Sequence, residues 1–568
     1  MADTLLPRGE TYADVYGRFR WAIPPAYNIA VDVCDRHAGD RARVALIHED
    51  DAGRVSEHTF AEFRARSNQL ARALAGLGVA RGDRVGIVLP QRPETAVAHL
   101  AAYKLGAVAL PLATLFGPEA LEYRLGDAGA KVVFTDAENL DRVLTVRKSL
   151  PALERVVCVD PADAEGVVDY ARALAAEPDG FEPVGTAAED PALLVYTSGT
   201  TGPPKGALHA HRVLLGHLPG VEFYHEFCPK PGDRFWTPAD WAWVGGLLDV
   251  LLPAWHYGLP VVAHRPKRFD AERCLEMLAR HRVRNTFLVP TMLKMLRAWG
   301  DPRGRFDLRL RSLFTGGEAA GEEVIRWSRE CLGVTPNEGY GQTEVNLVLG
   351  NCSAIMEVRP GSMGRPIPGH AVDVLDDAGR PVPAGEIGEV AVRRPDPVMF
   401  LGYWKNEQAT REKFVGDWAL TGDLARRDAD GYFWFVGRKD DLISSGGYRI
   451  GPGEVEECLG RHPAVALAAA IGAPDPLRGE VVKAFVQLRP GTAPSPELAR
   501  ALRDYVRTRL SAHEYPREIE FIEALPVTTT GKVKRGDLRA RERARRTPAR
   551  SREGRWATTT RGTSARSR

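Results

Sequence analysis

Apolar residues in the first quarter of the chain alternate between helical and strand-like spacing. Thr59 and Glu62 have the spacing of a capping box, and an apolar residue then recurs at the helical interval until Gly78, at Phe60, Phe63, Leu70, Leu74 and Leu77. Short apolar runs at 85–89, 108–112 and 131–135 are typical of buried strands, and a helical pattern over about 93–105 separates the first two. This alternation predicts βαβ units in a doubly wound α/β layer.

The same alternation resumes further along the chain and then changes character. Strand-like runs at 259–263 and 286–289 flank an amphipathic helix that carries Leu275 and Leu278. Beyond about residue 365, short segments such as 389–392 and 432–435 are separated by Gly, Pro and Asp turns, which predicts a β-rich subdomain. After Asp440, strands at 464–471 and 481–487 and a helix at about 496–511 predict a compact α+β domain of roughly 100 residues.

Length and composition indicate a multidomain globular protein. The 568 residues exceed what one hydrophobic core usually organises, and the apolar fraction of 44% and charged fraction of 26% are those of a globular chain. The formal charge of +2 conceals a basic end, since residues 539–568 hold 11 Arg against 2 Glu. Ser, Thr and Ala fill the rest of this end, so we predict a disordered tail and expect no nucleic-acid partner.

Cysteine use and the N-terminal residues bear on location. The 7 cysteines are scattered without a close pair, which favours a reduced, cytoplasmic protein over a disulfide framework or a metal site. Charged residues follow Met1–Pro7, so no signal peptide is predicted. The longest apolar run, 244–254, is interrupted by Asp249 and Pro253 and is shorter than the roughly 18 residues of a membrane span. We therefore expect no membrane span.

The segment 196–206 is the strongest functional signal in the sequence. It reads Tyr-Thr-Ser-Gly-Thr-Thr-Gly-Pro-Pro-Lys-Gly and follows the apolar run 193–195, which is typical of a buried strand. Glycines let a backbone approach an anion closely, successive N–H groups can form a donor nest, and Ser, Thr and Lys205 add hydroxyls and a positive charge. This composition predicts a phosphate-binding loop.

Two alternatives to a phosphate loop of this kind are less favourable. A Walker P-loop needs Ser or Thr directly after its lysine and a helix after the loop, whereas Gly206 follows Lys205 here and Pro203–Pro204 oppose a helix. A polar surface loop is the common fate of shorter Gly/Ser/Thr clusters. The length and order of this segment, which continues into Leu208–His211, favour phosphate binding.

Further motifs follow the loop in a fixed order. They are 315–319 (Thr-Gly-Gly-Glu-Ala), 338–344 (Glu-Gly-Tyr-Gly-Gln-Thr-Glu), 421–424 (Thr-Gly-Asp-Leu), 437–441 (Gly-Arg-Lys-Asp-Asp) and 526–532 (Pro-Val-Thr-Thr-Thr-Gly-Lys). With the loop, they resemble the phosphate loop, adenine turn, central signature, ribose site, hinge and C-terminal lysine loop of the adenylate-forming superfamily. That superfamily includes acyl-CoA synthetases, nonribosomal adenylation domains and firefly-type luciferases. The resemblance spans residue 27 to about residue 540.

The resemblance implies an α/β protein with the adenylate-forming enzyme fold. It implies a large N-terminal AMP-binding domain at 1–439, built of two doubly wound layers plus a distorted β-barrel. A small, mobile α+β lid domain would occupy 440–540, and the basic tail 541–568.

The resemblance also implies a site for ATP. Tyr340 is expected to stack on adenine, Asp423 to accept hydrogen bonds from both ribose hydroxyls, and Arg438 to contact the nucleotide near the hinge. The other residues expected at the nucleotide lie in the phosphate loop, the adenine turn and the central signature: Thr197, Ser198, Gly199, Thr200, Thr201, Gly202, Lys205, Gly317, Glu318, Ala319, Glu338 and Gly339.

The implied reaction joins two negatively charged groups, because a carboxylate attacks the α-phosphorus of ATP. Such a site must cancel charge and hold the attack in line. Lys532 resembles the adenylation lysine that bridges carboxylate and phosphate, Thr343 the hydroxyl on the α-phosphate, and Glu344 the carboxylate that holds Mg²⁺. One hard carboxylate ligand with phosphates and waters is an arrangement that Mg²⁺ commonly takes.

The hinge region separates the branches of the superfamily. Residues 440–452 resemble those of the acetyl-CoA and medium-chain acyl-CoA synthetases. In that branch Asp440 would be the pivot about which the lid rotates once the adenylate has formed. Gly446 and Gly447, close to Arg449, would then line a narrow tunnel for coenzyme A, which suits glycine because no side chain obstructs it. The CoA thiol would displace AMP and form the thioester.

Two positions bear on which acid is used. Acetate-specific relatives have a tryptophan directly before Gln-Thr-Glu, whose indole closes the pocket, and this chain has Gly341 there. Loss of that wall predicts room for a medium-chain, branched or aryl acid. Trp243 matches an aromatic position beside the acyl site, whereas Trp236 and Trp241 depart from the pattern of the branch and have no assigned role, a place in the core being the plain alternative.

We therefore expect an ATP-dependent, AMP-forming acyl-CoA synthetase that acts on a carboxylic acid larger than acetate. A carrier protein as acceptor would need a helical module after residue 540, where the Arg-rich tail stands, and the hinge sequence disfavours a luciferase-like oxygenase. A nucleotide-binding relative without catalysis is expected to lack Lys532, Glu344 or the glycine loop, and all three are present. The sequence leaves the oligomeric state open.

Overall fold

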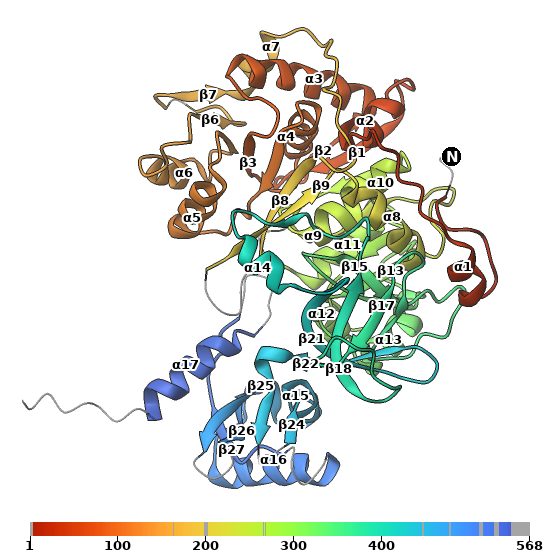
Figure 1. Cartoon of the computed structure of the whole chain (residues 1–568), viewed down its shortest axis with the longest axis vertical. Coiled ribbons are helices and arrows are strands. Elements are labelled where there is room, and N and C mark those ends of the chain that lie inside the picture. The colour runs from red at the N-terminus through yellow and green to blue at the C-terminus, as the bar shows by residue number, and fades with distance from the viewer. Residues whose placement is uncertain are drawn as a thin grey trace, which may run out of the picture. The chain divides into compact units, whose positions relative to one another are not determined.

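The chain forms two compact units, Met1–Asp440 and Asp441–Arg568 (Figure 1). The structure is a computed structural model that describes residues 4–162, 164–197, 203–264, 266, 268–445, 448–475, 479–510, 515–527 and 533–546. Each unit has its own sheets and hydrophobic core.

An eight-stranded sheet forms one layer of the N-terminal unit, in the order β19-β9-β8-β4-β3-β5-β6-β7 among the described residues. Strands β3 to β8 run parallel, and β9 and β19 add an antiparallel edge. The strands are β3 (Arg84–Val88), β4 (Val108–Pro111), β5 (Val132–Thr135), β6 (Arg155–Cys158), β7 (Val167–Asp169), β8 (Pro191–Thr197), β9 (Lys205–Ala210) and β19 (Gly402–Tyr403).

A second, fourteen-stranded sheet forms the other layer of this unit, as far as the structure describes it. Strands β1 and β10 to β14 are parallel, and the sheet continues antiparallel from β14 through β15, β16, β22, β21 and β18 to β17. Its strands are β1 (Val44–Glu49), β2 (Val55–Thr59), β10 (Phe235–Trp236), β11 (Val261–Ala263), β12 (Asn285–Phe287), β13 (Ser312–Gly316), β14 (Pro336–Gln342), β15 (Asn346–Gly350), β16 (Ser362–Pro366), β17 (Val372–Leu375), β18 (Ile387–Arg393), β20 (Phe414–Val415), β21 (Trp418–Arg427) and β22 (Phe433–Arg438).

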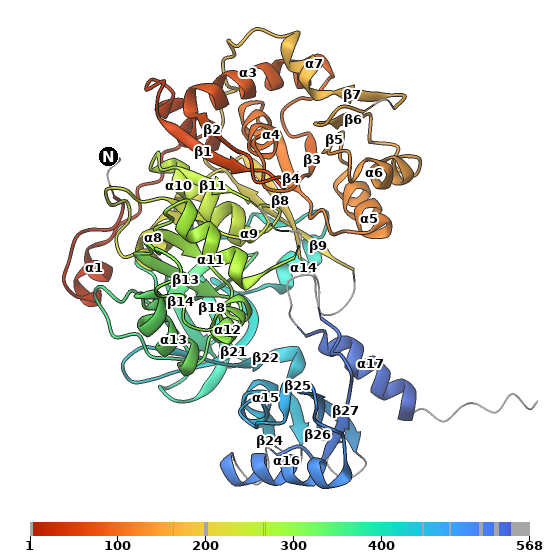
Figure 2. The ribbon, with the colours of Figure 1, turned by 180° about the vertical axis from the view of Figure 1, so that it is seen from behind.

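Helices pack against the parallel parts of these two sheets (Figures 1 and 2). The largest core cluster joins residues of both sheets to α2 (Ile29–Val33), α3 (Phe60–Gly76), α4 (Pro93–Lys104), α8 (Val213–Tyr224) and α10 (Leu252–His256). Helix α8 is buried along its whole length, as expected of a helix that is apolar on all sides. The outer faces are packed by α5 (Pro118–Ala128) and α6 (Leu140–Arg147) on the smaller sheet, and by α11 (Ala271–Arg280), α12 (Pro290–Trp299) and α13 (Glu322–Trp327) on the larger.

The remaining helices of the unit are short. They are α1 (Tyr12–Arg18), α7 (Tyr170–Ala175), α9 (Val244–Gly246) with the π-helical turn Leu247–Leu251 after it, and α14 (Glu407–Glu412). The two doubly wound layers expected of this unit are confirmed.

Local signals in the sequence were reliable. The Thr59 hydroxyl accepts from the Glu62 N–H at 3.2 Å, and the Glu62 carboxylate accepts from the Thr59 N–H at 2.8 Å, so the predicted capping box begins α3. Trp236 and Trp241 are core residues, each 1% exposed. The strands predicted near 85–89, 108–112, 131–135, 259–263, 286–289, 389–392 and 432–435 correspond to β3, β4, β5, β11, β12, β18 and β22.

The distorted barrel expected in this unit is not a closed barrel. Within the described residues the antiparallel strands continue the parallel sheet, because β15 pairs with β14 on one side and with β16 on the other. The path ends at β17, which pairs with β18. The β-rich subdomain is therefore an extension of the larger sheet.

The C-terminal unit is an α+β fold, as expected. Its described strands form a five-stranded sheet in the order β24-β23-β26-β25, with β27 parallel to β26. The strands are β23 (Ile443–Ser445), β24 (Tyr448–Ile450), β25 (Val465–Asp475), β26 (Gly479–Leu488) and β27 (Glu518–Phe521), and the helices are α15 (Pro452–Gly460), α16 (Pro496–Arg509) and α17 (Arg535–Arg546). Val455 and Leu459 of α15 and Leu502 and Val506 of α16 pack against the sheet.

Helix α17 extends into the segment 541–568 that was expected to be disordered. Glu542 of this helix is 1% exposed and accepts a hydrogen bond of 2.5 Å from the equally buried Lys483 of β26. Lys483 also donates to Glu520 of β27 at 2.7 Å. A charge-assisted network of this kind ties the helix to the sheet, so the expectation of disorder is wrong for residues 541–546, and residues 547–568 lie outside the described part. No helix in the described ranges is long and apolar enough to cross a membrane.

Candidate active site

The predicted phosphate loop connects two antiparallel strands. Thr197 ends β8 and Lys205 begins β9, and the two residues are register partners. The Thr197 hydroxyl donates to the Lys205 carbonyl oxygen at 3.3 Å, which closes the base of the loop. Ser198, Gly199, Thr200, Thr201 and Gly202 lie outside the described residues. A strand, not a helix, follows Lys205, which agrees with the exclusion of a Walker P-loop.

Lys205 and Glu344 both contact Tyr403, a residue that no sequence motif marked. The Lys205 ammonium lies 5.2 Å from the centre of the Tyr403 ring, and the Tyr403 hydroxyl donates a hydrogen bond of 2.5 Å to Glu344 Oε1. Strand β19, which carries Tyr403, pairs with β9, which carries Lys205. Burial and then the Glu344 carboxylate raise the pKa of Tyr403, so its hydroxyl stays protonated and donates.

Thr343 and Glu344 lie in the tight turn between β14 and β15. The turn is held by the Phe400 N–H, which donates to the Glu344 carbonyl oxygen at 2.9 Å, and by Asn346, whose φ of 48° is left-handed. The Asn346 side chain donates to the Val398 carbonyl oxygen at 3.0 Å. Asn tolerates left-handed backbone better than most residues, so the turn that presents Glu344 is locally encoded.

Glu338 is buried and binds the backbone next to the adenine turn. It is 5% exposed, and its carboxylate accepts the N–H of Ala320 at 2.9 Å and that of Gly361 at 3.2 Å. Burial raises the pKa of Glu338 to about 7. Its strand β14 runs beside β13, which leads into Gly317 with φ of +93°. Glu338 therefore holds the backbone that follows the turn.

The rest of the adenine turn lies at the surface. Gly317, Glu318 and Ala319 are exposed. Glu318 accepts hydrogen bonds from Thr291, from its N–H at 3.0 Å and from its hydroxyl at 2.5 Å. The left-handed conformation of Gly317 explains why glycine stands there.

Tyr340 and Asp423 are in contact, although 83 residues separate them. The Tyr340 hydroxyl donates to Asp423 Oδ2 at 2.6 Å, and Gln342 Nε2 lies 3.4 Å from the same oxygen. Arg438 is the register partner of Asp423 on the neighbouring strand β22, with Nε at 3.7 Å from Oδ1. Three predicted nucleotide residues, one on each of β14, β21 and β22, thus lie together.

Lys413 is a further charged residue of this cluster, and no sequence motif marked it. Its ammonium donates to Gln342 Oε1 at 2.9 Å and to the Thr421 carbonyl oxygen at 3.3 Å. Burial lowers the pKa of Lys413, and the carboxylates of Glu344, Asp423 and Glu389 act in the opposite direction. Lys413 therefore brings a hydrogen-bond donor into an acidic cluster.

Gly339 and Gly341 of β14 are packed too tightly for a side chain. A Cβ at Gly341 would lie 1.6 Å from the Asn346 carbonyl oxygen, and one at Gly339 would lie 2.2 Å from the Tyr224 hydroxyl. Real Cβ atoms are not found at such distances from backbone. A side chain at Gly341, an indole included, would therefore displace the turn that carries Thr343 and Glu344.

Trp243 is partly buried and directly precedes α9. Its ring meets that of Phe116 edge to face, with centroids 6.0 Å apart. Two residues further, a Cβ at Gly245 would lie 2.6 Å from the Phe287 ring. Phe287 stacks on Phe314 and Phe314 on Tyr224, at centroid distances of 4.9 and 4.1 Å. An aromatic row therefore runs from the Trp243 segment to the β14 glycines.

The hinge region continues into a buried ion-pair cluster in the C-terminal unit. Asp440 lies in the short 3₁₀ turn Lys439–Asp441. Asp441, 5% exposed at its side chain, pairs with Arg539 at 2.6 Å and Arg535 at 3.4 Å. Arg535 also pairs with Glu456 of α15 at 2.5 Å. Gly446 and Gly447 lie outside the described residues, and of Arg449 the structure describes the backbone, which pairs with Ser444 in the β23–β24 hairpin.

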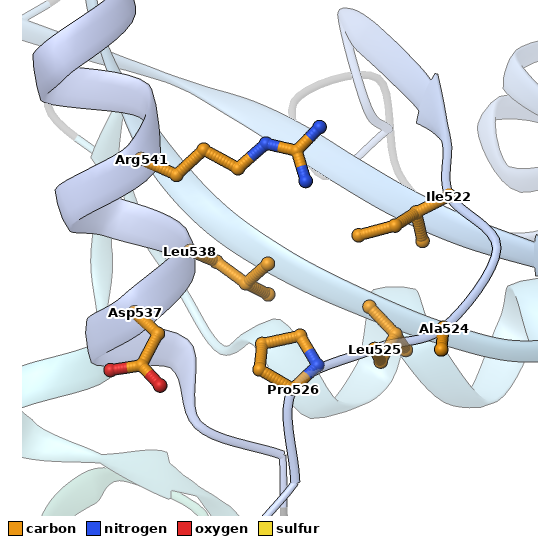
Figure 3. A pocket seen from close by; sticks show the side chains of 7 residues that line it. All are labelled: Ile522, Ala524, Leu525, Pro526, Asp537, Leu538 and Arg541. Atoms are coloured by element: carbon orange, nitrogen blue, oxygen red, sulfur yellow. The ribbon is translucent and has the colours of Figure 1, made fainter.

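Lys532 also lies outside the described residues, but the base of its loop is described. Val527 and Val533 form an antiparallel bridge, and the Lys534 N–H donates to the Pro526 carbonyl oxygen at 2.8 Å. A groove of about 460 Å³ lies beside this base, and Figure 3 shows Leu538 of α17 directed toward Leu525 and Pro526. Its lining is Ile522, Ala524, Leu525, Pro526, Asp537, Leu538 and Arg541.

The donor set at Glu344 fits a magnesium ion that also binds phosphates. Its carboxylate is 8% exposed, and Oε1 is oriented by Tyr403. In the described part of the chain no group of three or more His, Cys, Asp or Glu could hold a metal by itself. Mg²⁺ commonly takes one or two carboxylates and completes its shell with phosphate oxygens and waters, which matches a single oriented carboxylate.

Comparisons with known proteins show the family of the chain. The AMP-binding enzyme family matches residues 33–404, and the AMP-binding enzyme C-terminal domain matches residues 454–532. Acetyl-coenzyme A synthetase of Bacillus subtilis (strain 168) is 36% identical over 550 residues, which cover 94% of this chain and 95% of that protein. The human mitochondrial acyl-coenzyme A synthetase ACSM5 is 35% identical over 536 residues, which cover 92% of each.

Two solved structures have the same fold over nearly their whole length. The anthranilate CoA ligase AuaEII in complex with anthranoyl-AMP is 33% identical with a TM-score of 0.83, covering 92% of this chain and 98% of its own. A benzoate CoA ligase from Burkholderia xenovorans LB400 is 28% identical with a TM-score of 0.80, and the match covers 90% of this chain and 100% of the ligase. The motifs, the fold and these matches together establish that the chain belongs to the AMP-binding enzyme family.

Proposed function

We propose that this chain is an ATP-dependent acyl-CoA synthetase that forms an acyl-adenylate and passes the acyl group to coenzyme A. The observation that carries the proposal is the arrangement beside the C-terminal end of β14, where Lys205, Tyr403 and Glu344 form one end of a site and Tyr340 and Asp423 form the other. One end suits phosphates and the other a ribose. The synthetase and CoA-ligase names of the relatives support coenzyme A as the acceptor.

In the first half-reaction a carboxylate oxygen attacks the α-phosphorus, and the bond to pyrophosphate breaks. Both reactants are negative, so positive charge from Lys205 and Lys532 lowers the barrier. Thr343 would donate its hydroxyl to the α-phosphate, and Glu344 would hold Mg²⁺. The bound Mg²⁺ would supply further neutralisation of the phosphate charge.

In the second half-reaction the CoA sulfur attacks the acyl carbonyl carbon. The bond between that carbon and the phosphate oxygen breaks, AMP leaves with the electron pair, and the thiol proton is lost to solvent. We propose Asp440 as the pivot between an AMP-binding domain at 1–439 and a lid at 440–540, with Gly446, Gly447 and Arg449 lining the approach of coenzyme A.

The acid is proposed to be larger than acetate, either medium-chain fatty, branched or aryl. Gly341 supports this, because it provides no indole to close the pocket, and the strand is packed around a glycine there. The named acids of two structural relatives, anthranilate and benzoate, are aromatic. Trp243 would lie beside the acyl group. A cytoplasmic location stays a prediction, since ACSM5 is named as mitochondrial.

The test is release of pyrophosphate and AMP by the purified protein with ATP, Mg²⁺ and acids from acetate through decanoate to benzoate, each with and without CoA. We expect CoA-dependent AMP release that is greatest with an acid longer than propionate or with an aryl acid. Pyrophosphate release that does not respond to CoA would indicate another acceptor, and a maximum at acetate would contradict the proposed acid.

A further inference from the structure

Lys413 occupies a position that the proposed mechanism does not use. It follows α14 and lies between the ribose end and the phosphate end of the site, since its ammonium bonds to Gln342 and to the Thr421 carbonyl oxygen. Gln342 immediately precedes Thr343 and Glu344, and Thr421 lies two residues before Asp423. One cation thus bonds to both segments that present nucleotide-binding side chains.

The bond to Gln342 fixes which way its amide faces. Gln342 Oε1 accepts from Lys413 at 2.9 Å, which leaves Nε2 to donate to the Thr421 carbonyl oxygen at 2.9 Å and to lie 3.4 Å from Asp423 Oδ2. Without Lys413, only the bond to the Thr421 carbonyl oxygen would oppose rotation of the amide, which would place its oxygen against the Asp423 carboxylate. An ammonium has only donors, so Lys413 reinforces the amide orientation in which Nε2 faces Asp423.

The charge of Lys413 has a second effect. Glu344, Asp423 and Glu389 are each less than 9% exposed. The charge of each carboxylate raises the pKa of this ammonium. A nucleotide triphosphate brings several more negative charges to the same region. In a buried environment opposite charges interact strongly, so removal of this cation should weaken binding of a polyanion there.

We propose that Lys413 is a positioning residue of the nucleotide site, which orients Asp423 through Gln342 and offsets the negative charge between the ribose and phosphate ends. It acts on ATP and not on the acid or coenzyme A. This inference rests on the proposed function, because it takes ATP as the substrate.

The test compares Lys413→Met with Lys405→Met. Lys405 lies 8 residues earlier in the sequence, is exposed, and donates to the Asp127 carbonyl oxygen at 2.7 Å, so the control removes the same charge away from the carboxylate cluster. We expect Lys413→Met to weaken ATP binding, measured by titration calorimetry without acid, about tenfold or more, and to raise KM for ATP similarly. KM for the acid and for CoA should change less than about twofold, and Lys405→Met should match the wild type.

A double-mutant cycle with Gln342→Ala tests the route through Gln342. If Lys413 orients Asp423 through that amide, Lys413→Met lowers ATP affinity clearly less in the Gln342→Ala protein than in the wild type. Fully additive losses of affinity overturn this part of the inference. Equal rises in all three KM values, or unchanged ATP binding, overturn the whole. A wild type that binds no ATP contradicts the proposed function instead. Lys413→Gln, which keeps a donor but no charge, replaces Lys413→Met if the latter does not fold.

Discussion

Tyr403 donates a hydrogen bond of 2.5 Å to Glu344, from a two-residue strand to a turn 59 residues earlier in the chain. The same ring lies under the Lys205 ammonium. Because β19 is the edge strand beside β9 in the smaller sheet and Glu344 follows β14, an interior strand of the larger sheet, this contact joins the two sheets. Tyr403 therefore fixes the distance between the phosphate loop and the proposed metal carboxylate.

Tyr403→Phe should weaken the dependence on Mg²⁺ specifically. Loss of a hydrogen bond to a charged acceptor typically costs about 1.5–3 kcal/mol, part of which would appear as a roughly tenfold rise in the Mg²⁺ concentration for half-maximal pyrophosphate release. Tyr27→Phe is the matched control, because the Tyr27 hydroxyl donates to Asp32 at 2.6 Å far from the site in sequence. An equal response of the two variants would contradict a role for Tyr403 at the metal.

Gly341→Ala should lower activity toward every acid and should not convert the enzyme to acetate. A Cβ at this position would lie 1.6 Å from the Asn346 carbonyl oxygen, so the turn that carries Glu344 has to move. Overpacking of this kind costs about 1–3 kcal/mol or more. The measurements are the melting temperature and the acid profile of CoA-dependent AMP release.

The control for Gly341 is Gly180→Ala, because a Cβ at Gly180 meets no other atom within 4 Å. This variant should keep the stability and acid profile of the wild type. A stable Gly341→Ala protein with a shifted acid profile would show instead that position 341 acts only as a wall of the pocket.

The parts of the structure that the sequence predicted are those with local signals. The capping box of α3 and the strands around β3 to β5 depend on neighbours in sequence, and motif order identified the family. Tyr403 and Lys413 were missed because their significance comes from partners 59 and 71 residues away, which periodicity does not report. Glu338 was assigned to the nucleotide, whereas its described hydrogen bonds go to the N–H groups of Ala320 and Gly361.

The expected distorted barrel is not closed, and the sequence could not show this for a related reason. Short strands with Gly and Pro turns indicate antiparallel pairing but carry no information on whether the last strand returns to the first. The pairing of β15 with both β14 and β16, which joins these strands to the parallel sheet, is set by tertiary packing around the β14 glycines.

Glu338 should make stability fall as pH rises toward neutrality. Burial raises the pKa of Glu338 from 4.5 to about 7 in the folded state. Its contribution to the free energy of unfolding is complete below the unfolded pKa, where both states are protonated. This contribution, at most about 3 kcal/mol, is lost as pH rises through the folded pKa. In urea unfolding at pH 5 to 8, the free energy of unfolding should decline less steeply with pH for Glu338→Gln than for the wild type. Parallel profiles would contradict this assignment.

Lys532→Ala should separate the two half-reactions. Adenylate formation, measured as pyrophosphate release, should fall by at least about a hundredfold, because the positive charge proposed to lie beside the reacting phosphate is lost. Thioester formation from a supplied acyl-adenylate and CoA should be nearly unchanged, since the lid lysine is proposed to leave the site after rotation about Asp440. Equal losses in both assays would refute two lid positions. Lys534→Ala, two residues further along, is the control.

Arg535→Gln should disturb the C-terminal unit more than any surface charge change on the same helix. Arg535 pairs with both Asp441, beside the proposed pivot, and Glu456 of α15, and it stands three residues after Lys532. Its removal leaves two largely buried carboxylates with fewer partners, which we expect to destabilise the unit by about 2 kcal/mol or more. Pyrophosphate release should fall as well, because the base of the lysine loop loses its anchor to the segment after the pivot.

The control for Arg535 is Arg545→Gln. Arg545 lies on α17 too, but its side chain is 60% exposed and its ion pair with Glu520 is 3.1 Å long, so its loss should cost less than about 1 kcal/mol. Thermal unfolding of the full chain and pyrophosphate release measure both effects. If Arg545→Gln were as damaging as Arg535→Gln, loss of any ion-pairing Arg from α17 would account for the effect, and the anchor at Asp441 would not. If Arg535→Gln lowered stability but left pyrophosphate release intact, the cluster would hold the unit together without positioning the loop.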